Sequence, residues 1–256
     1  MIKKLLLTLL IAVLLTSCQS QPPLQSRQEF VLDTLVTIKV YPNKKSLKKI
    51  LSKAFKAIKK IENRFNLYQK NSETNKINQT AGQQIRVSQP MANLIKESLK
   101  VSQLTKGGFD ITIRPVFALY HFEGKGQVPT DQALWQALKY VGFKKLTFNY
   151  RTRRLQLKPK MALDFGGIMK GKAIDAASQL LKKSGVKSGL ITSVSSISIL
   201  GPKPDGSAWT IGLQSPDKKG LVGFLKIKKG NISTSGSYQQ FFRKNGRLYH
   251  HLINPK

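Results

Sequence analysis

The sequence predicts an α+β fold in a single domain, with mixed and largely antiparallel sheets and packed helices. The 256-residue chain is 40% hydrophobic and contains 12 Phe and 7 Tyr, which is enough to build a sizeable core. Helical and strand-like patterns are interspersed along the chain. Several strand-like segments follow one another directly, which favours α+β pairing over a regular doubly wound sheet.

The N-terminus has the pattern of an export signal. Lys3 and Lys4 precede an apolar run, LLLTLLIAVLL, which is too short to span a bilayer as a stable helix. The run ends in LTSC, which resembles the lipobox of bacterial lipoproteins and indicates Cys18, the only cysteine, as the lipidated residue. We therefore expect residues 1–17 to be a lipoprotein signal peptide. The protein is expected at the extracytoplasmic face of a bacterial cell membrane.

The next elements follow in order. Residues 18–29 are polar and contain a Pro-Pro pair, which predicts a tether. Residues 30–41 are rich in β-branched side chains and predict the first strand of a domain that runs to residue 256. From Ser46 to Phe65 apolar residues recur at helical spacing and lysines occupy the other face, which predicts an amphipathic helix.

The rest of the chain is divided by Gly, Pro and Asp turns. Pro90 begins a second predicted helix, and Gly185 caps a long one that starts after a glycine pair. The expected helices cover 90–104, 129–140 and the stretch that follows Gly167 and is capped by Gly185. A hairpin covers 145–158, and strand-like segments cover 188–201, 209–216, 223–236 and 247–255.

The net charge of +32 predicts an anionic partner or surface. The charge is mostly lysine, is spread over the chain, and lacks the aromatic-studded pattern of single-strand binders, so we expect no nucleic-acid partner. For a lipid-anchored protein, the anionic membrane surface is the partner that a basic face would meet. Compositional drift in the coding genome would produce the same lysine excess.

No Cys/His metal cluster, P-loop, GxGxxG or GxSxG motif is present, which removes the commonest enzyme classes. What remains is five short motifs of polar residues and glycine. Alone, each has an ordinary structural explanation; the glycine pair, for example, fits a strand-to-helix turn. The motifs are NLYQKNSETNKIN (66–78), GGFDITIRP (107–115), LDFGGIMKGKAID (163–175), NISTSGSY (231–238) and YHHLINPK (249–256).

Taken in order, these motifs resemble those of the ApbE family, the FAD:protein FMN transferases, from about Phe30 to the last residue. The resemblance implies an ApbE-like domain that takes FAD as its substrate and Mg²⁺ as its cofactor. It implies transfer of FMN from FAD to a Thr hydroxyl of an acceptor flavoprotein, with release of AMP. In such phosphoryl transfer the protein mainly supplies positioning and charge neutralisation.

The resemblance also assigns roles to individual residues. The carbonyl of Gly167 is the implied Mg²⁺ ligand, and Asp164 and Lys170 are implied to contact FAD. Gly108, Phe109 and Asp110 would line the dinucleotide site. The complete set of implied FAD contacts is Leu32, Tyr68, Gly108, Phe109, Asp110, Asp164, Lys170 and Ile253.

Ordinary structural roles remain open for several of these residues. Phe109 and Ile253 also fit core positions, Tyr68 a half-buried surface ring, and Asp110 a turn or cap. His251 is the candidate catalytic base or proton shuttle, because an imidazole titrates near neutral pH. His250 and His121 are expected to be surface or satisfied core residues.

The chain departs from the family pattern in two places. Ser195 and Ser196 stand where a glycine pair is usual, and Asn254 replaces an Asp. The sequence given stops at Lys256, before the family's Asp and Thr segment that completes the cation site, so we expect weak metal binding and an exposed sheet edge. The alternative function is therefore a truncated, weakly active or inactive paralogue that acts as a flavin-binding or membrane-surface lipoprotein.

Overall fold

The computed structural model describes residues 23–42, 46–122, 125–217, 219–237 and 240–255. The predicted signal peptide and Cys18 lie outside this part of the chain. Within it, no helix has the length and apolar character needed to cross a membrane.

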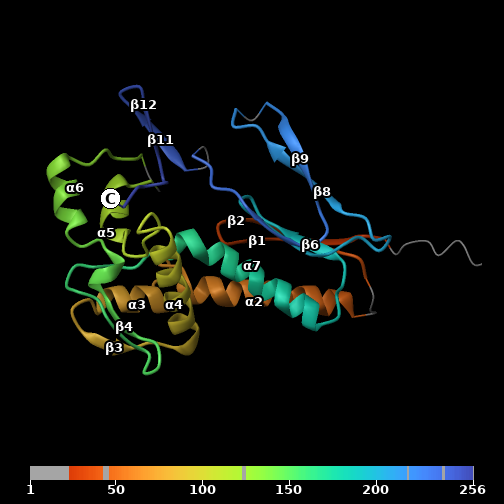
Figure 1. Cartoon of the computed structure of the whole chain (residues 1–256), viewed down its shortest axis with the longest axis horizontal. Coiled ribbons are helices and arrows are strands. Elements are labelled where there is room, and N and C mark those ends of the chain that lie inside the picture. Colours follow the sequence, from red (N-terminus) through yellow and green to blue (C-terminus); the bar gives the residue numbers. More distant parts are fainter. Residues whose placement is uncertain (1–22, 43–45, 123–124, 218, 238–239, 256) are drawn as a thin grey trace, which may run out of the picture.

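The centre of the fold is a five-stranded antiparallel sheet in the order β1-β2-β6-β7-β10. Helices α2 (Leu47–Phe65) and α7 (Gly166–Lys183) pack against each other along one side of this sheet (Figure 1). The predicted α+β class is confirmed. The strands are β1 (Gln25–Val31), β2 (Thr34–Val40), β6 (Gly189–Thr192), β7 (Ser196–Gly201) and β10 (Gly230–Ser233).

Shorter elements gather at one end of the α2–α7 pair, around a three-stranded sheet in the order β3-β5-β4 (Figure 1). Two further hairpins, β8–β9 and β11–β12, form separate two-stranded sheets. Trp209 of β8 packs with Leu190 and Ile199 of the central sheet. The elements outside the central sheet and the α2–α7 pair are α3 (Glu73–Gln79), β3 (Gln84–Arg86), α4 (Gln89–Leu104), α5 (Arg114–Phe117), η1 (Ala118–Tyr120), α6 (Asp131–Leu138), η2 (Phe143–Lys145), β4 (Thr147–Asn149), β5 (Arg154–Gln156), β8 (Trp209–Gln214), β9 (Leu221–Ile227), β11 (Phe241–Lys244) and β12 (Arg247–His250).

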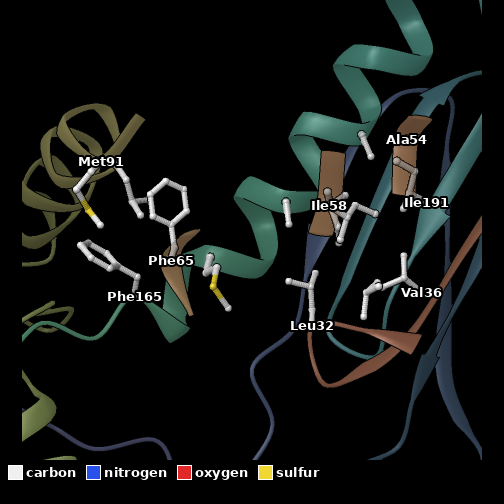
Figure 2. Packing of buried hydrophobic residues seen from close by; sticks show 14 of the residues in the cluster. Leu32, Val36, Ala54, Ile58, Phe65, Met91, Phe165 and Ile191 are labelled. Carbon is white, nitrogen blue, oxygen red and sulfur yellow. The ribbon is translucent and has the colours of Figure 1, made fainter. Parts of the chain in front are cut away.

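One continuous core joins the sheet to the peripheral elements. The apolar face of α2 places Ala54 and Ile58 against Val36 and Ile191 of the sheet (Figure 2). At the far end of α2, Phe65 packs on Phe165, with ring centroids 6.5 Å apart. Each fully buried side chain of this size contributes about 1.5–3 kcal/mol, so this core fixes the place where α7 begins.

The first predicted strand is wrong in its extent, because residues 30–41 form parts of two strands. Leu32 and Asp33 both adopt positive φ angles, 57° and 56°, and reverse the chain between β1 and β2. Strand β1 also begins at Gln25, so the end of the predicted tether belongs to the sheet. The predicted segment 223–236 likewise divides, between β9 and β10.

The β1–β2 turn depends on a long-range hydrogen bond. The Leu32 N–H donates to Oε1 of Glu62 on α2 at 2.8 Å, and the Leu32 side chain is only 1% exposed. A left-handed conformation costs an L-residue about 1–2 kcal/mol, which burial of a leucine side chain offsets. Burial raises the pKa of Glu62, the Leu32 N–H opposes that rise, and the nearby Asp33 charge adds to it.

This contact predicts a pH-dependent effect of Glu62→Gln on the free energy of unfolding. The amide keeps an acceptor for Leu32 but has no charge to desolvate, so the variant should be more stable than the parent at pH 7. Because the folded-state pKa of Glu62 is raised, the protonated form is favoured in the fold. The advantage should shrink as the pH falls towards 4.5 and below.

Urea unfolding of both proteins between pH 4 and 7 measures this difference. Glu62→Ala is the control, because it leaves the Leu32 N–H without its acceptor and should cost about 1–3 kcal/mol at every pH. A stability difference between parent and Glu62→Gln that does not change with pH would contradict this interpretation.

Candidate functional site

Three of the five motifs meet at one junction ahead of α7. The Asn78 side chain pairs with the backbone of Leu163: its Nδ2 donates to the carbonyl at 2.9 Å, and its Oδ1 accepts from the N–H at 2.7 Å. The next residue, Asp164, donates its N–H to the carbonyl of Ile111 at 2.7 Å. These bonds hold the first three motifs together, so the side chains beside them have fixed positions.

Asp164 caps the start of α7. Its Oδ1 accepts the Gly166 N–H at 2.8 Å, which places a carboxylate at the positive end of the helix dipole. A Cβ at Gly167 would lie 3.1 Å from Cε2 of Phe109, so the glycine allows the Phe109 ring to approach the helix closely. A Cβ at Gly166 would likewise lie 3.0 Å from Oδ1 of Asp164, so a side chain at either glycine would press on a residue of the candidate site. Neither glycine has a positive φ.

Asp110 braces the loop that carries Gly108 and Phe109. Its Oδ1 accepts from the N–H and hydroxyl of Thr112 at 2.8 and 2.6 Å, and its Oδ2 accepts from the Phe143 N–H at 2.7 Å. Only 6% of Asp110 is exposed, and both oxygens have protein partners. The structure therefore gives Asp110 a turn-bracing role, while a place in a dinucleotide site stays a prediction.

Tyr68 is half exposed and lies beside Arg114, a residue to which the family motifs assigned no role. The Arg114 guanidinium is 5.4 Å from the centre of the Tyr68 ring, and its Nη1 donates to Oη at 3.3 Å. Such a pair presents an aromatic face and a positive charge together. Arg114 lies within the second motif, GGFDITIRP, and this position is the sequence signal that could have identified it as a site residue.

Lys170 and Lys172 lie on α7 but have different surroundings. Lys172 is bound to Glu97, with Nζ 2.7 Å from Oε2. Among the described residues, no carboxylate forms an ion pair with Lys170, which is half-buried one turn into the helix. Lys170 follows Gly167 by three residues, so both belong to the first turns of α7.

The two C-terminal candidates are Ile253 and His251. Ile253 packs against Val116 and Val141, within a small cluster formed by α5 and α6. The Nδ1 of His251 lies 3.2 Å from the carbonyl of Gln240, which can only accept, so Nδ1 carries the proton of this contact. The described contacts do not join His251 to Asp164 or Lys170.

Leu32 and His121 occupy ordinary structural positions, whereas His250 does not. Leu32 is part of the main core at the tip of the β1–β2 turn (Figure 2). His250 has a buried Nδ1 with no hydrogen-bond partner, so the expectation of a satisfied or surface histidine is wrong for that atom. His121 is exposed, in a left-handed conformation after η1, as expected of a surface residue.

Serine is compatible with the turn where the family usually has glycine. Neither Ser195 nor Ser196 has a positive φ, and the Ser193 hydroxyl accepts the Ser196 N–H at 3.1 Å. The Thr234 N–H donates to the carbonyl of Ser195 at 2.8 Å, which joins this turn to the fourth motif. The β-carbons therefore do not crowd the turn itself.

The described residues do not form a complete Mg²⁺ site. A carbonyl in the first turn of a helix, such as that of Gly167, ordinarily accepts the amide four residues later, so one lone pair is left for a cation. Mg²⁺ requires several oxygen ligands in octahedral geometry. In the described part of the chain, no group of three His, Cys, Asp or Glu side chains comes together.

The chain is similar in sequence and in fold to several known proteins. The chain is 29% identical over 226 residues to an FAD:protein FMN transferase of Klebsiella pneumoniae, covering 86% of this chain and 69% of the relative. A Vibrio cholerae FAD:protein FMN transferase is 27% identical over 204 residues, covering 77% and 61%. The crystal structure of the Thermotoga maritima ApbE protein superposes with a TM-score of 0.86 at 29% identity, covering 91% of this chain and 77% of that one.

The chain thus spans 61–69% of the length of these two curated relatives. The ApbE family model matches residues 32–256, which include all five motifs and the junction between α3, the 107–115 loop and α7. The chain therefore belongs to the ApbE family.

Proposed function

We propose that this protein binds FAD around the start of α7 and transfers its FMN part to a Thr hydroxyl of an acceptor flavoprotein, releasing AMP. The observation that carries the proposal is the hydrogen-bonded junction of Asn78, Ile111 and Leu163, which gathers three motifs of the family. The names of the relatives, FAD:protein FMN transferase, support the same substrate.

The proposed reaction is a single displacement at phosphorus. The Thr oxygen forms a bond to the FMN-side phosphorus, and the bond from that phosphorus to the bridging pyrophosphate oxygen breaks. AMP leaves with that electron pair, and the hydroxyl proton passes to a base. Because the chemistry needs little beyond alignment and charge neutralisation, the protein has two tasks: it holds the pyrophosphate, and it aligns the Thr oxygen with the phosphorus that it attacks.

Different residues of the described chain have different parts in binding FAD and in catalysis under this proposal. Lys170, with which no described carboxylate forms an ion pair, supplies positive charge for the pyrophosphate. Phe109 and the Tyr68–Arg114 pair offer apolar and aromatic faces for the rings of FAD. His251 is the proposed base: since its Nδ1–H is directed at Gln240, Nε2 is the nitrogen that is left to accept a proton.

Mg²⁺ remains the cation that the family resemblance implies, with the Gly167 carbonyl as one ligand. Because the described residues do not complete such a site, we assign no step of the reaction to a metal. The same observation favours the second candidate function, a lipoprotein that binds flavin nucleotide but transfers FMN poorly.

One assay separates the two functions. The chain is incubated with FAD and a Thr-bearing acceptor domain, with and without Mg²⁺, and labelling is measured by in-gel flavin fluorescence. If a cation ligand is lacking, transfer should be about a thousandfold or more below that of a longer family member, with measurable FAD binding. Strong Mg²⁺-dependent labelling would exclude the non-catalytic function, and absence of FAD binding would contradict both.

A second prediction concerns the residues at the start of α7. Lys170→Ala should weaken FAD binding about tenfold to a hundredfold, because one charge-assisted contact is worth roughly 1.5–3 kcal/mol. Lys172→Ala is the matched control, since Lys172 lies on the same helix and is paired with Glu97. Equal FAD affinities for the two variants, measured by fluorescence titration, would show that Lys170 makes no such contact.

Asp164 needs a variant that separates its two roles. Asp164→Asn keeps an oxygen for the Gly166 N–H, so helix capping should survive while the charge is lost. Asp164→Ala removes both. If Asp164 contacts FAD through its charge, both variants should bind FAD about tenfold or more weakly; if it acts only as a cap, Asp164→Asn should bind like the parent.

We also propose that Cys18 is lipidated and anchors the protein at the extracytoplasmic face of a bacterial membrane. The LTSC sequence after an apolar core supports this proposal. Globomycin, which blocks lipoprotein signal cleavage, should cause a larger precursor to accumulate on immunoblots, and Cys18→Ser should release the protein from the membrane fraction. Unchanged mobility and fractionation in both experiments would refute lipidation.

A further inference from the structure

A cavity of about 650 Å³, widely open to solvent, lies between α2 and α3 and shares no residue with the candidate FAD site. Its lining contains five cationic side chains and a single carboxylate, and none of the predicted FAD contacts. The charged residues are Lys56, Lys59, Lys60, Arg64, Lys76 and Glu73.

The one carboxylate is already used within the protein. Glu73 accepts the Ser88 N–H at 2.7 Å through Oε1 and the Ser88 hydroxyl at 2.6 Å through Oε2. Arg64 belongs to the same group, because its Nη1 donates to the Ser88 hydroxyl at 3.1 Å and lies 3.8 Å from Glu73. This network fixes the start of α4 and leaves little negative charge for the cavity.

Of the four lysines that line the cavity, one forms an ion pair with a described carboxylate and three do not. The Nζ of Lys59 lies 2.8 Å from Oε2 of Glu29 on β1. Lys56, Lys60 and Lys76 form no ion pair with any described residue. Lys56 and Lys60 are four residues apart on α2 and so project from one face of the helix, where like charges repel.

Three unpaired ammonium groups around one cavity raise the local potential and attract multivalent anions. Asn63 and Asn71 add amide donors to the lining, and no aromatic side chain takes part. Such a lining suits the phosphate part of a ligand better than a planar ring. We propose that this α2–α3 cavity binds a phosphate-bearing anion, which is either the headgroup of an anionic phospholipid or a soluble polyphosphate.

The proposal is independent of FMN transfer, and the full chain can be tested directly. Partition is measured by flotation with vesicles of phosphatidylglycerol and phosphatidylcholine, relative to pure phosphatidylcholine vesicles, which report the contribution of the apolar leader alone. Binding of tripolyphosphate is measured by equilibrium dialysis. The test variant is Lys56→Gln/Lys60→Gln/Lys76→Gln.

The matched control is Lys226→Gln/Lys228→Gln/Lys229→Gln, which removes the same charge from exposed positions on β9 and directly after it. One lysine near an anionic surface contributes about a fivefold effect, so the test variant should lose about a hundredfold in affinity for the probe that binds. The control should lose less than threefold, and both variants should keep the parent's affinity for FAD.

A loss confined to vesicles identifies the ligand as a lipid headgroup, and a loss confined to tripolyphosphate identifies a soluble phosphate compound. Equal losses in the test and control variants would mean that net charge alone attracts the anion, which overturns the proposal. Failure of the parent to bind either probe would overturn it too.

Discussion

The pair of hydrogen bonds between Asn78 and Leu163 is the constraint on which the candidate site depends. It joins residues 85 positions apart and places Asp164 where its N–H reaches Ile111. The junction lies directly against the core, through Phe165 and its packing on Phe65. The start of α7 is therefore fixed from two sides, by apolar packing and by polar pairing, before any ligand binds.

Carboxylates hold two further loops of the fold in place. Asp110 holds the 107–115 loop to Phe143, and Glu62 holds the turn at Leu32 to α2. Each uses a buried or half-buried carboxylate to satisfy backbone N–H groups that the sheets and helices leave unpaired. In a chain with 12 acidic and 44 basic residues, these carboxylates fix loops. Among the described residues, only Lys59 and Lys172 of the lysines form ion pairs.

The sequence predicted the regular elements well where apolar periodicity was strong. The helix expected from Ser46 to Phe65 is α2, within one residue, because its alternation of apolar and lysine positions is sustained over five turns. The turn at Leu32 was missed, since a leucine at positive φ has no local signal and depends on Glu62, 30 residues away. The family motifs identified the segments of the site, but not the Asp110–Phe143 and Tyr68–Arg114 contacts, which only tertiary structure creates.

The most direct test of this account compares FAD binding by Asn78→Ala, Asn78→Asp and Asn75→Ala, with folding checked by circular dichroism. Asn75 lies on the same helix, and its described hydrogen bonds go to Ser72 and Gln69 instead of Leu163. We expect Asn75→Ala to bind FAD like the parent and Asn78→Ala to bind about tenfold or more weakly. Asn78→Asp, which keeps the acceptor for the Leu163 N–H, should fall between them. A folded Asn78→Ala variant with the parent's FAD affinity would contradict the claim that this junction builds the site.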